Sequence, residues 1–129
     1  MAYYNQKIII IDYKEMFFMK KLFKCSVCNF VCEGETAPAV CPKCGQPHEK
    51  FNELPTESAD KVYASERTND IHMEIISLID KVIALSHEGI NLNLDPACVG
   101  TFTKAINEGY IVKQRSKAEI ENHITKGKW

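Results

Sequence analysis

Apolar residues in the second half of the chain recur at the spacing of an α-helix. From residue 71 to residue 85 they alternate at intervals of four and three, which predicts one face of an amphipathic helix. The residues of this first row are Ile71, Ile75, Leu78, Val82 and Leu85. A second row beside it, Ile76, Ile79 and Ile83, makes the predicted buried face wide. We expect Gly89 to end this helix as its C-cap.

A short helix is predicted before the long one. Pro55 to Ser58 has the composition of a linker that ends in an N-cap, either Thr56 or Ser58. The short helix then covers about residues 57–67. Polar residues at 68–70 predict a kink or a second cap, which separates the short helix from the long one.

The last predicted helix has a clear beginning. Asp95 followed by Pro96 is a favourable start, because aspartate is a strong N-cap and proline fits the first turn. Apolar positions continue to about Lys126, with one interruption at Gly109. Together with the preceding helices, this predicts an antiparallel helical hairpin.

The first half of the chain has short apolar runs without a helical period. Leu22 to Lys24 predicts a strand, and Phe30-Val31 predicts its hairpin partner. Gly34 and Ala37-Pro38 mark the turn that follows. A module of residues 19–54 is too short for a conventional hydrophobic core, so we expect a bound ion to replace one. The expected apolar cover is Phe23, Phe30 and Phe51.

Residues 1–18 are predicted to be a dispensable, poorly ordered N-terminal extension. Their one apolar run, Ile8 to Ile11, could instead add a strand to the ribbon. Asp12 stops that run far short of a signal peptide or a membrane span, so we expect a cytoplasmic protein with no membrane partner. The predicted fold class is α+β, with this extension followed by a metal-binding ribbon at 19–54 and a helical hairpin at 55–129.

The composition of the 129 residues is that of an ordinary globular chain, with 45% hydrophobic and 26% charged residues. The formal net charge of −1, with acidic and basic residues interleaved, gives no reason to expect nucleic acid as a partner. Two helices with wide apolar faces cannot cover themselves, so we expect two hairpins to associate as a homodimer with a four-helix bundle. Packing of the ribbon against the hairpin is the competing way to bury the same surface.

Four of the six cysteines form two Cys-x-x-Cys pairs, Cys25 with Cys28 and Cys41 with Cys44. Such a turn directs two thiolates toward one ion, and two pairs on facing turns complete a tetrahedron. In a chain without an export signal, these pairs predict metal ligands or redox thiols rather than structural disulfides, and two pairs at this separation favour a metal site. Tetrahedral sulfur binds either iron or zinc, and the spacing alone favours structural zinc.

The residues around the pairs predict how the thiolates are stabilised. Asn29 and Gly45 follow the two pairs and tolerate the left-handed conformation that lets N–H groups point at sulfur. We expect Cys32 to be a small, partly buried side chain, with a spare thiol that exchanges with the site as the alternative. Cys98, in the first turn of the last helix, is expected to be an inert core thiol rather than one activated by the helix dipole.

The loop between the pairs resembles the rubredoxin-like iron domain of rubrerythrins. The matching run is Glu33-Gly34-x-x-Ala37-Pro38-x-x-Cys41-Pro42-x-Cys44-Gly45-x-Pro47, followed by Phe51. Zinc ribbons share the Cys-Pro-x-Cys-Gly turn but not usually this loop. The first turn, Cys28-Asn29-Phe30, departs from the Cys-Gly-Tyr that is common in the family.

The resemblance covers residues 22–54 and implies a small rubredoxin-like two-knuckle ribbon that transfers electrons. It implies one iron ion (Fe2+/Fe3+) that passes one electron at a time to or from a redox partner protein, with Zn2+ as the alternative cofactor. The implied ligands are Cys25, Cys28, Cys41 and Cys44.

Rubrerythrins reduce peroxide at a di-iron site built from glutamates and Glu-x-x-His pairs. No Glu-x-x-His occurs in this chain. We therefore expect an electron carrier rather than a peroxidase. The alternative function is a structural zinc-ribbon interaction or regulatory module with a helical dimerisation hairpin. A third hypothesis is a di-iron site shared by two chains, although solvated helix faces explain its residues more simply: His72, Glu74, Glu121 and His123.

Overall fold

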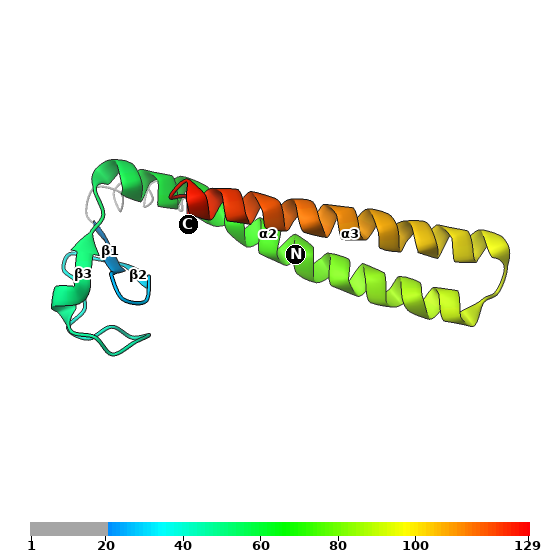
Figure 1. Cartoon of the computed structure of the whole chain (residues 1–129), viewed down its shortest axis with the longest axis horizontal. Coiled ribbons are helices and arrows are strands. Elements are labelled where there is room, and N and C mark those ends of the chain that lie inside the picture. The colour runs from blue at the N-terminus through cyan, green and yellow to red at the C-terminus, as the bar shows by residue number, and fades with distance from the viewer. Residues whose placement is uncertain (1–20) are drawn as a thin grey trace, which may run out of the picture. The chain divides into compact units, whose positions relative to one another are not determined.

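The computed structural model of the chain describes residues 21–129 (Figure 1). The predictions made for residues 1–18 lie outside the described residues. The chain divides into two compact units between Ala59 and Asp60, a small ribbon and a helical hairpin, each with its own contacts. The α+β class predicted from the sequence is confirmed. No helix within residues 21–129 combines the length and the apolar character that crossing a membrane requires.

The ribbon is built around a three-stranded antiparallel sheet in the order β2-β1-β3. The strands are β1 (Lys21–Cys25), β2 (Val31–Gly34) and β3 (Phe51–Glu53), with a short 3-10 helix, η1 (His48–Lys50), before β3. The predicted strand and its hairpin partner are confirmed as β1 and β2. The third strand was not predicted, because three residues carry no periodic pattern and become a strand only by pairing with β1.

The core of the ribbon surrounds the cysteines. Its buried members are Phe23, Cys25, Cys41 and Phe51. Phe30 packs against this cluster and is half-buried, so the predicted cover by three phenylalanines is confirmed. The largest side chains that are completely buried are two cysteines, Cys25 and Cys41. Thiols therefore occupy the centre where a larger domain would place leucine or isoleucine.

The hairpin consists of two long helices, α2 (Thr56–Leu92) and α3 (Pro96–Thr125). The predicted hairpin is confirmed, but the separate short helix is not, because α2 runs without a break through residues 68–70. The predicted linker is also shorter than expected, since α2 already begins at Thr56. In α3 the predicted N-cap is confirmed: the Asp95 carboxylate accepts a hydrogen bond of 2.8 Å from the N–H of Cys98.

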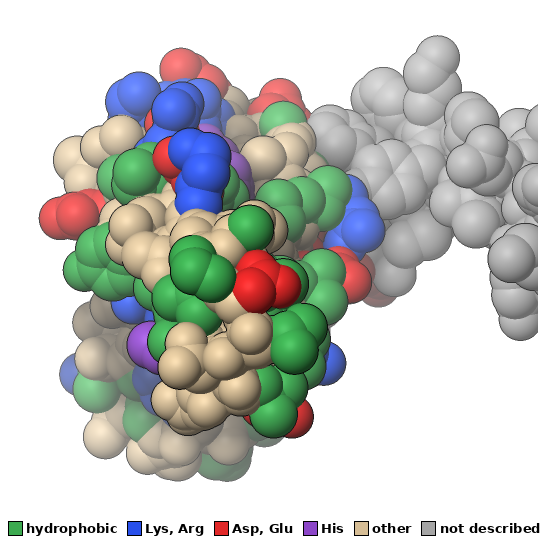
Figure 2. Space-filling view, turned by 90° about the vertical axis from the view of Figure 1, so that its right-hand side faces the viewer, with side chains coloured by type: hydrophobic (Ala, Val, Ile, Leu, Met, Phe, Trp, Pro, Cys, Tyr) green, Lys and Arg blue, Asp and Glu red, His purple; other side chains and the backbone are tan. Residues whose placement is uncertain are grey.

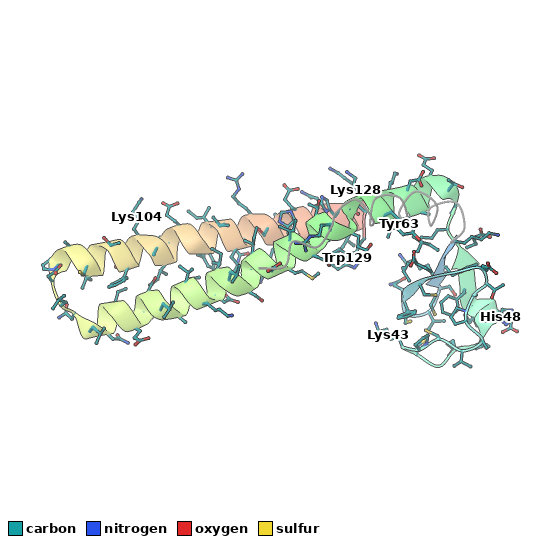
Figure 3. The ribbon with its side chains drawn as sticks, turned by 180° about the vertical axis from the view of Figure 1, so that it is seen from behind. Lys43, His48, Tyr63, Lys104, Lys128 and Trp129 are labelled. Carbon is teal, nitrogen blue, oxygen red and sulfur yellow. The ribbon has the colours of Figure 1, made fainter. Side chains whose placement is uncertain are left out.

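Contacts with the C-terminal residues that follow α3 hold α2 where a break was predicted. The Asn69 side-chain amide donates to the carbonyl of Lys128 at 2.8 Å, and the Ser65 hydroxyl donates to the same carbonyl at 2.7 Å. The end of the chain therefore lies beside the N-terminal third of α2, where Figure 3 labels Lys128 and Trp129. Asn69, one of the polar residues that predicted a cap, instead binds a distant backbone group.

Glycines inside the helices are positioned by close packing. Gly89 does not end α2 as predicted, because the helix continues to Leu92. Glycine is needed there for packing, since the ring of Phe102 lies 2.4 Å from the position of a Cβ. Gly109 likewise lies inside α3 and faces Ile79 and Ile83, whose side chains are 3.4 and 3.6 Å from the position of a Cβ. These two glycines let the helices approach, and neither interrupts its helix.

Candidate metal centre

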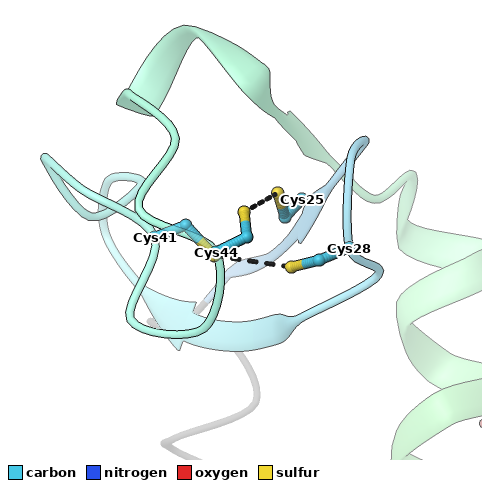
Figure 4. Close-up of side chains that lie close together, drawn as sticks. All are labelled: Cys25, Cys28, Cys41 and Cys44. Carbon is cyan, nitrogen blue, oxygen red and sulfur yellow. Dashed lines mark hydrogen bonds between the residues drawn. The ribbon is translucent and has the colours of Figure 1, made fainter.

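The two Cys-x-x-Cys pairs come from separate turns of the ribbon. Cys25 is the last residue of β1 and Cys28 lies in the turn that follows, whereas Cys41 and Cys44 lie in the loop between β2 and η1. The structure brings all four sulfur atoms within 4.8 Å of one another (Figure 4). The sulfurs of Cys25 and Cys44 are 3.7 Å apart, and those of Cys28 and Cys41 are 3.6 Å apart.

These separations suit four ligands around one ion. A tetrahedral centre ~2.3 Å from each sulfur requires sulfurs that are ~3.8 Å apart. A disulfide would need a separation of only ~2.0 Å, and none of the six cysteines is in one. The cluster is therefore a four-cysteine metal-binding site.

The two turns have the same backbone geometry. Asn29 has a φ of 67° and Gly45 has a φ of 75°, so both occupy the left-handed region expected for them. The N–H of Asn29 donates to the carbonyl of Cys25 at 3.0 Å, and the N–H of Gly45 donates to that of Cys41 at 2.9 Å. No atom lies within 4 Å of a Cβ built on Gly45, so conformation rather than space requires glycine there.

Backbone N–H groups point at the sulfurs, as predicted. The N–H of Cys28 is the largest influence on Cys25 and, with that of Val27, lowers the pKa of its thiol despite burial. Burial alone would raise the pKa of Cys41, but the N–H groups of Cys44 and Lys43 outweigh it and lower the pKa to about 6. The turns thus favour the thiolate at the two most buried cysteines.

Cys44 shows why a cation belongs among these sulfurs. The N–H of Gln46 lowers the pKa of Cys44, but burial and the three neighbouring sulfurs outweigh it and raise the pKa to about 12. Four thiolates this close repel one another strongly unless a positive charge lies between them. A metal cation supplies that charge, so the donor set fits a bound metal.

The site is more accessible on one side than on the other. Cys25 and Cys41 are buried, whereas Cys28 and Cys44 lie closer to solvent. Lys43 lies beside this accessible edge, with its Nζ 3.5 Å from the carbonyl of Cys28. An approaching molecule would therefore meet the second cysteine of each pair first.

The remaining two cysteines are not part of the cluster. Cys32 lies on β2, where its sulfur contacts the carbonyl of Phe23 at 3.9 Å. Burial, with a smaller contribution from Cys41, raises the pKa of the Cys32 thiol, which keeps it protonated. Cys98 is half-buried at the start of α3, with its sulfur 3.4 Å from a carboxylate oxygen of Asp95.

The histidines of the hairpin approach each other without forming a metal site. The rings of His72 and His123 are 6.2 Å apart, centre to centre. Nδ1 of His123 is hydrogen-bonded to the side-chain oxygen of Asn69, and Nδ1 of His72 is buried without a partner. Across residues 21–129, the four-cysteine cluster is the one group of three or more metal-ligating side chains that converges. Glu74 and Glu121 therefore do not join the histidines within one chain.

Backbone contacts that the sequence did not reveal hold each of the two turns in place. The N–H of Ser26, in the first turn, donates to the carbonyl of Lys50 at 2.8 Å. The second turn is closed by a bond of 2.8 Å from the N–H of Cys41 to the carbonyl of Gln46 and by a bridge between Val40 and Pro47. The similar spacing of the two cysteine pairs could have indicated these matching turns.

Comparisons with known proteins agree with the geometry. Residues 23–52 match the family model described as "Rubrerythrin, rubredoxin-like domain". The chain is also 35% identical over 98 residues to reverse rubrerythrin-1 of Clostridium acetobutylicum, an alignment that covers 71% of this chain and 49% of that protein. The chain thus spans about half the length of the curated relative it matches, and the alignment is too long to be confined to the ribbon. Residues 23–52 are a rubredoxin-like domain of the rubrerythrin type, followed in this chain by a helical region without the Glu-x-x-His motif.

Proposed function

We propose that this protein is a cytoplasmic one-electron carrier in which Cys25, Cys28, Cys41 and Cys44 bind a single iron ion. The observation that carries the proposal is the convergence of four sulfurs at tetrahedral spacing within a rubredoxin-like domain. Iron in such a site supplies reversible exchange of one electron between its ferric and ferrous forms.

The residues of the ribbon support this role by holding the sulfurs rigidly. Each turn is closed by backbone hydrogen bonds, and β1 connects the first turn directly to the sheet. A site that keeps the same geometry in both oxidation states needs little rearrangement when an electron arrives or leaves. The N–H groups of Val27, Cys28, Lys43 and Gln46 stabilise negative charge on sulfur, which tunes the reduction potential.

The accessible edge of the site is where we place the redox partner. Cys44 is exposed at this edge, and the neighbouring apolar side chains of Val27 and Val40 are 55% and 59% exposed. A partner protein that covers these residues would approach the sulfurs and exclude water from the contact. The positive charge of Lys43 would favour an acidic surface on that partner.

Electron transfer rather than peroxide chemistry is proposed because the chain supplies no Glu-x-x-His pair. Among the residues that the structure describes, no carboxylate converges with His72 and His123 to complete a metal site. The four cysteines are therefore the only converging set of metal-ligating groups within residues 21–129 through which electrons could pass.

Metal analysis and visible absorption of anaerobically purified protein test the proposal. We expect about one iron per chain from iron-replete cells, with a visible spectrum that bleaches on reduction. Cys44→Ser should lose this spectrum, whereas the control Cys32→Ser should keep both the iron and the colour because Cys32 lies outside the cluster. A colourless wild-type protein that contains zinc would contradict the proposal and support a structural zinc ribbon.

A further inference from the structure

No large apolar side chain of the helical hairpin is fully buried within residues 21–129. The buried residues of the hairpin are Ser65, Asn69, Ser86, Gly89, Gly109 and Ser116. All the buried hydrophobic side chains within residues 21–129 belong to the ribbon instead. Long helices are stabilised in proteins mainly by burying an apolar face, which must offset the conformational entropy lost on folding. The contact between α2 and α3 therefore buries its apolar side chains only in part.

An apolar stripe on α2 supplies the missing surface. We define the stripe as Ile71, Ile75, Leu78, Val82, Leu85 and Leu92. Successive members are three or four residues apart, except for one gap of seven, so they occupy the a and d positions of a heptad. Five of the six are exposed, from 39% for Ile71 to 76% for Leu92, and Ile75 is half-buried.

The stripe does not face α3. The neighbouring row packs there instead, as the approach of Ile79 and Ile83 to Gly109 shows. The wide apolar face predicted from the sequence thus has two parts. The row with Ile79 and Ile83 contacts α3, and the stripe is open to solvent. Hydrophobic side chains also lie among charged ones at the end of the hairpin where α2 and α3 are joined (Figure 2).

Charges beside the stripe identify what covers it. Arg67, Glu74, Lys81 and Glu88 occupy successive g positions of the heptad and are all exposed. Their signs alternate, and none of the four has an ion-pair partner within the described residues. Suppose that α2 of a second chain packs antiparallel to this helix, related to it by a two-fold axis near Ser77. Each charged g residue of one chain would then lie opposite a g residue of opposite charge on the other chain.

This pairing selects a single register. It sets Glu74 against Lys81 of the partner subunit and Arg67 against Glu88 of the partner subunit, each twice because of the symmetry. Sliding one helix by a heptad in either direction would bring like charges together. A parallel arrangement would offer no such pairs, because the e positions hold His72, Ile79 and Ser86.

We propose that the apolar stripe of α2 binds the same stripe of a second copy of this chain, in antiparallel orientation, to form a homodimeric four-helix bundle. Ile71 then packs opposite Val82 of the partner subunit, and Ile75 opposite Leu78 of the partner subunit. Each dimer carries two four-cysteine sites. The pairing is independent of which metal those sites bind.

Sedimentation equilibrium of the metal-loaded full chain tests the dimer. We expect a mass twice that of the chain. Leu78→Glu should raise the dimer dissociation constant by more than about a hundredfold, because each interface would bury two unpaired carboxylates. The control is Met73→Glu, on the same helix but off the stripe, where the original side chain is 44% exposed compared with 52% for Leu78. This control should remain dimeric, and far-UV circular dichroism should show both variants to be helical.

A charge exchange tests the register. Lys81→Glu places acidic groups opposite each other twice and should weaken the dimer roughly tenfold. Combining it with Glu74→Lys restores opposite charges and should return the dissociation constant to near the wild-type value. A monomeric wild-type chain, or equal effects of Leu78→Glu and Met73→Glu, would overturn the proposal. Failure of the double exchange to restore binding would overturn the antiparallel register.

Discussion

The ribbon and the hairpin both have few buried apolar side chains, but they differ in what lies at their buried positions. The ribbon gathers its buried side chains around four sulfurs, with Cys25 and Cys41 at the centre. The hairpin has more than twice as many residues in regular structure, yet its buried positions hold serine, asparagine and glycine. The ribbon is built to hold a ligand within it, whereas the dimer that we propose would supply the apolar contact that the hairpin lacks.

This difference shows that regular secondary structure and a buried core are separate requirements. Backbone hydrogen bonds complete α2 and α3 along their length, but they do not bury apolar area. The ribbon has only short strands and many turns, and strong bonds to a central ion can replace much of the missing apolar burial. Changes to the metal site and changes to the helix contacts should therefore have distinct effects.

The largest expected effect is loss of the ribbon when its metal is lost. Cys41→Ser removes a sulfur that is 2% exposed, so the variant should bind no metal and the sheet should unfold. Hydrogen exchange should show loss of amide protection in β1 and β2, while the helical circular dichroism of α2 and α3 stays nearly unchanged. The same result is expected for wild-type protein treated with a strong chelator. A ribbon that stays protected without metal would contradict the dependence on a ligand.

A smaller effect is expected from a single methyl group in the hairpin. Gly89→Ala places a Cβ 2.4 Å from the ring of Phe102, so the ring must move and the helices must separate. This strain should exceed the gain in helix propensity and destabilise the hairpin by about 1–3 kcal/mol in urea unfolding. Gly100→Ala is the matched control, because no atom lies within 4 Å of its Cβ, and it should stabilise by about 0.5–1 kcal/mol. Equal effects at both positions would show that packing at Gly89 is unimportant.

The smallest expected effect is a pH dependence at the start of α3. The N–H of Cys98, together with the Cys98 side chain, lowers the pKa of Asp95 below its ordinary value of 3.8. A carboxyl with a lowered pKa stabilises the folded state above its ordinary pKa, and this stabilisation is lost as the pH falls through the lowered value. Thermal unfolding of α3 should therefore become more acid-sensitive in wild type than in Asp95→Asn, which keeps the cap without the charge. Parallel pH profiles for the two proteins would refute this role for the charge.

Local chemistry explains what the sequence predicted correctly. The two cysteine pairs, Asn29 and Gly45 in left-handed conformations, and the Asp95 cap all depend on a few neighbouring residues. Each is set by turn geometry or by capping, which the local sequence determines. The four-cysteine cluster could therefore be predicted before the structure was known.

The errors arose where distant residues decide the local structure. Asn69 predicted a break in α2, but its side chain binds the carbonyl of Lys128, almost sixty residues away. Gly89 predicted a helix end, but its missing side chain makes room for Phe102 on the other helix. The strand β3 exists because Phe51 pairs with Cys25 across the sheet. None of these partners is visible in a local pattern.

Redox titration of the anaerobic full chain, followed by visible absorption, tests the central claim most directly. The account predicts a single reversible transition in which one electron is taken up per iron bound by the four cysteines. It also predicts the same transition in Cys32→Ser and none in Cys44→Ser. A metal-loaded wild-type protein that accepts no electron across the potential range of rubredoxin-like and iron–sulfur centres would contradict the account.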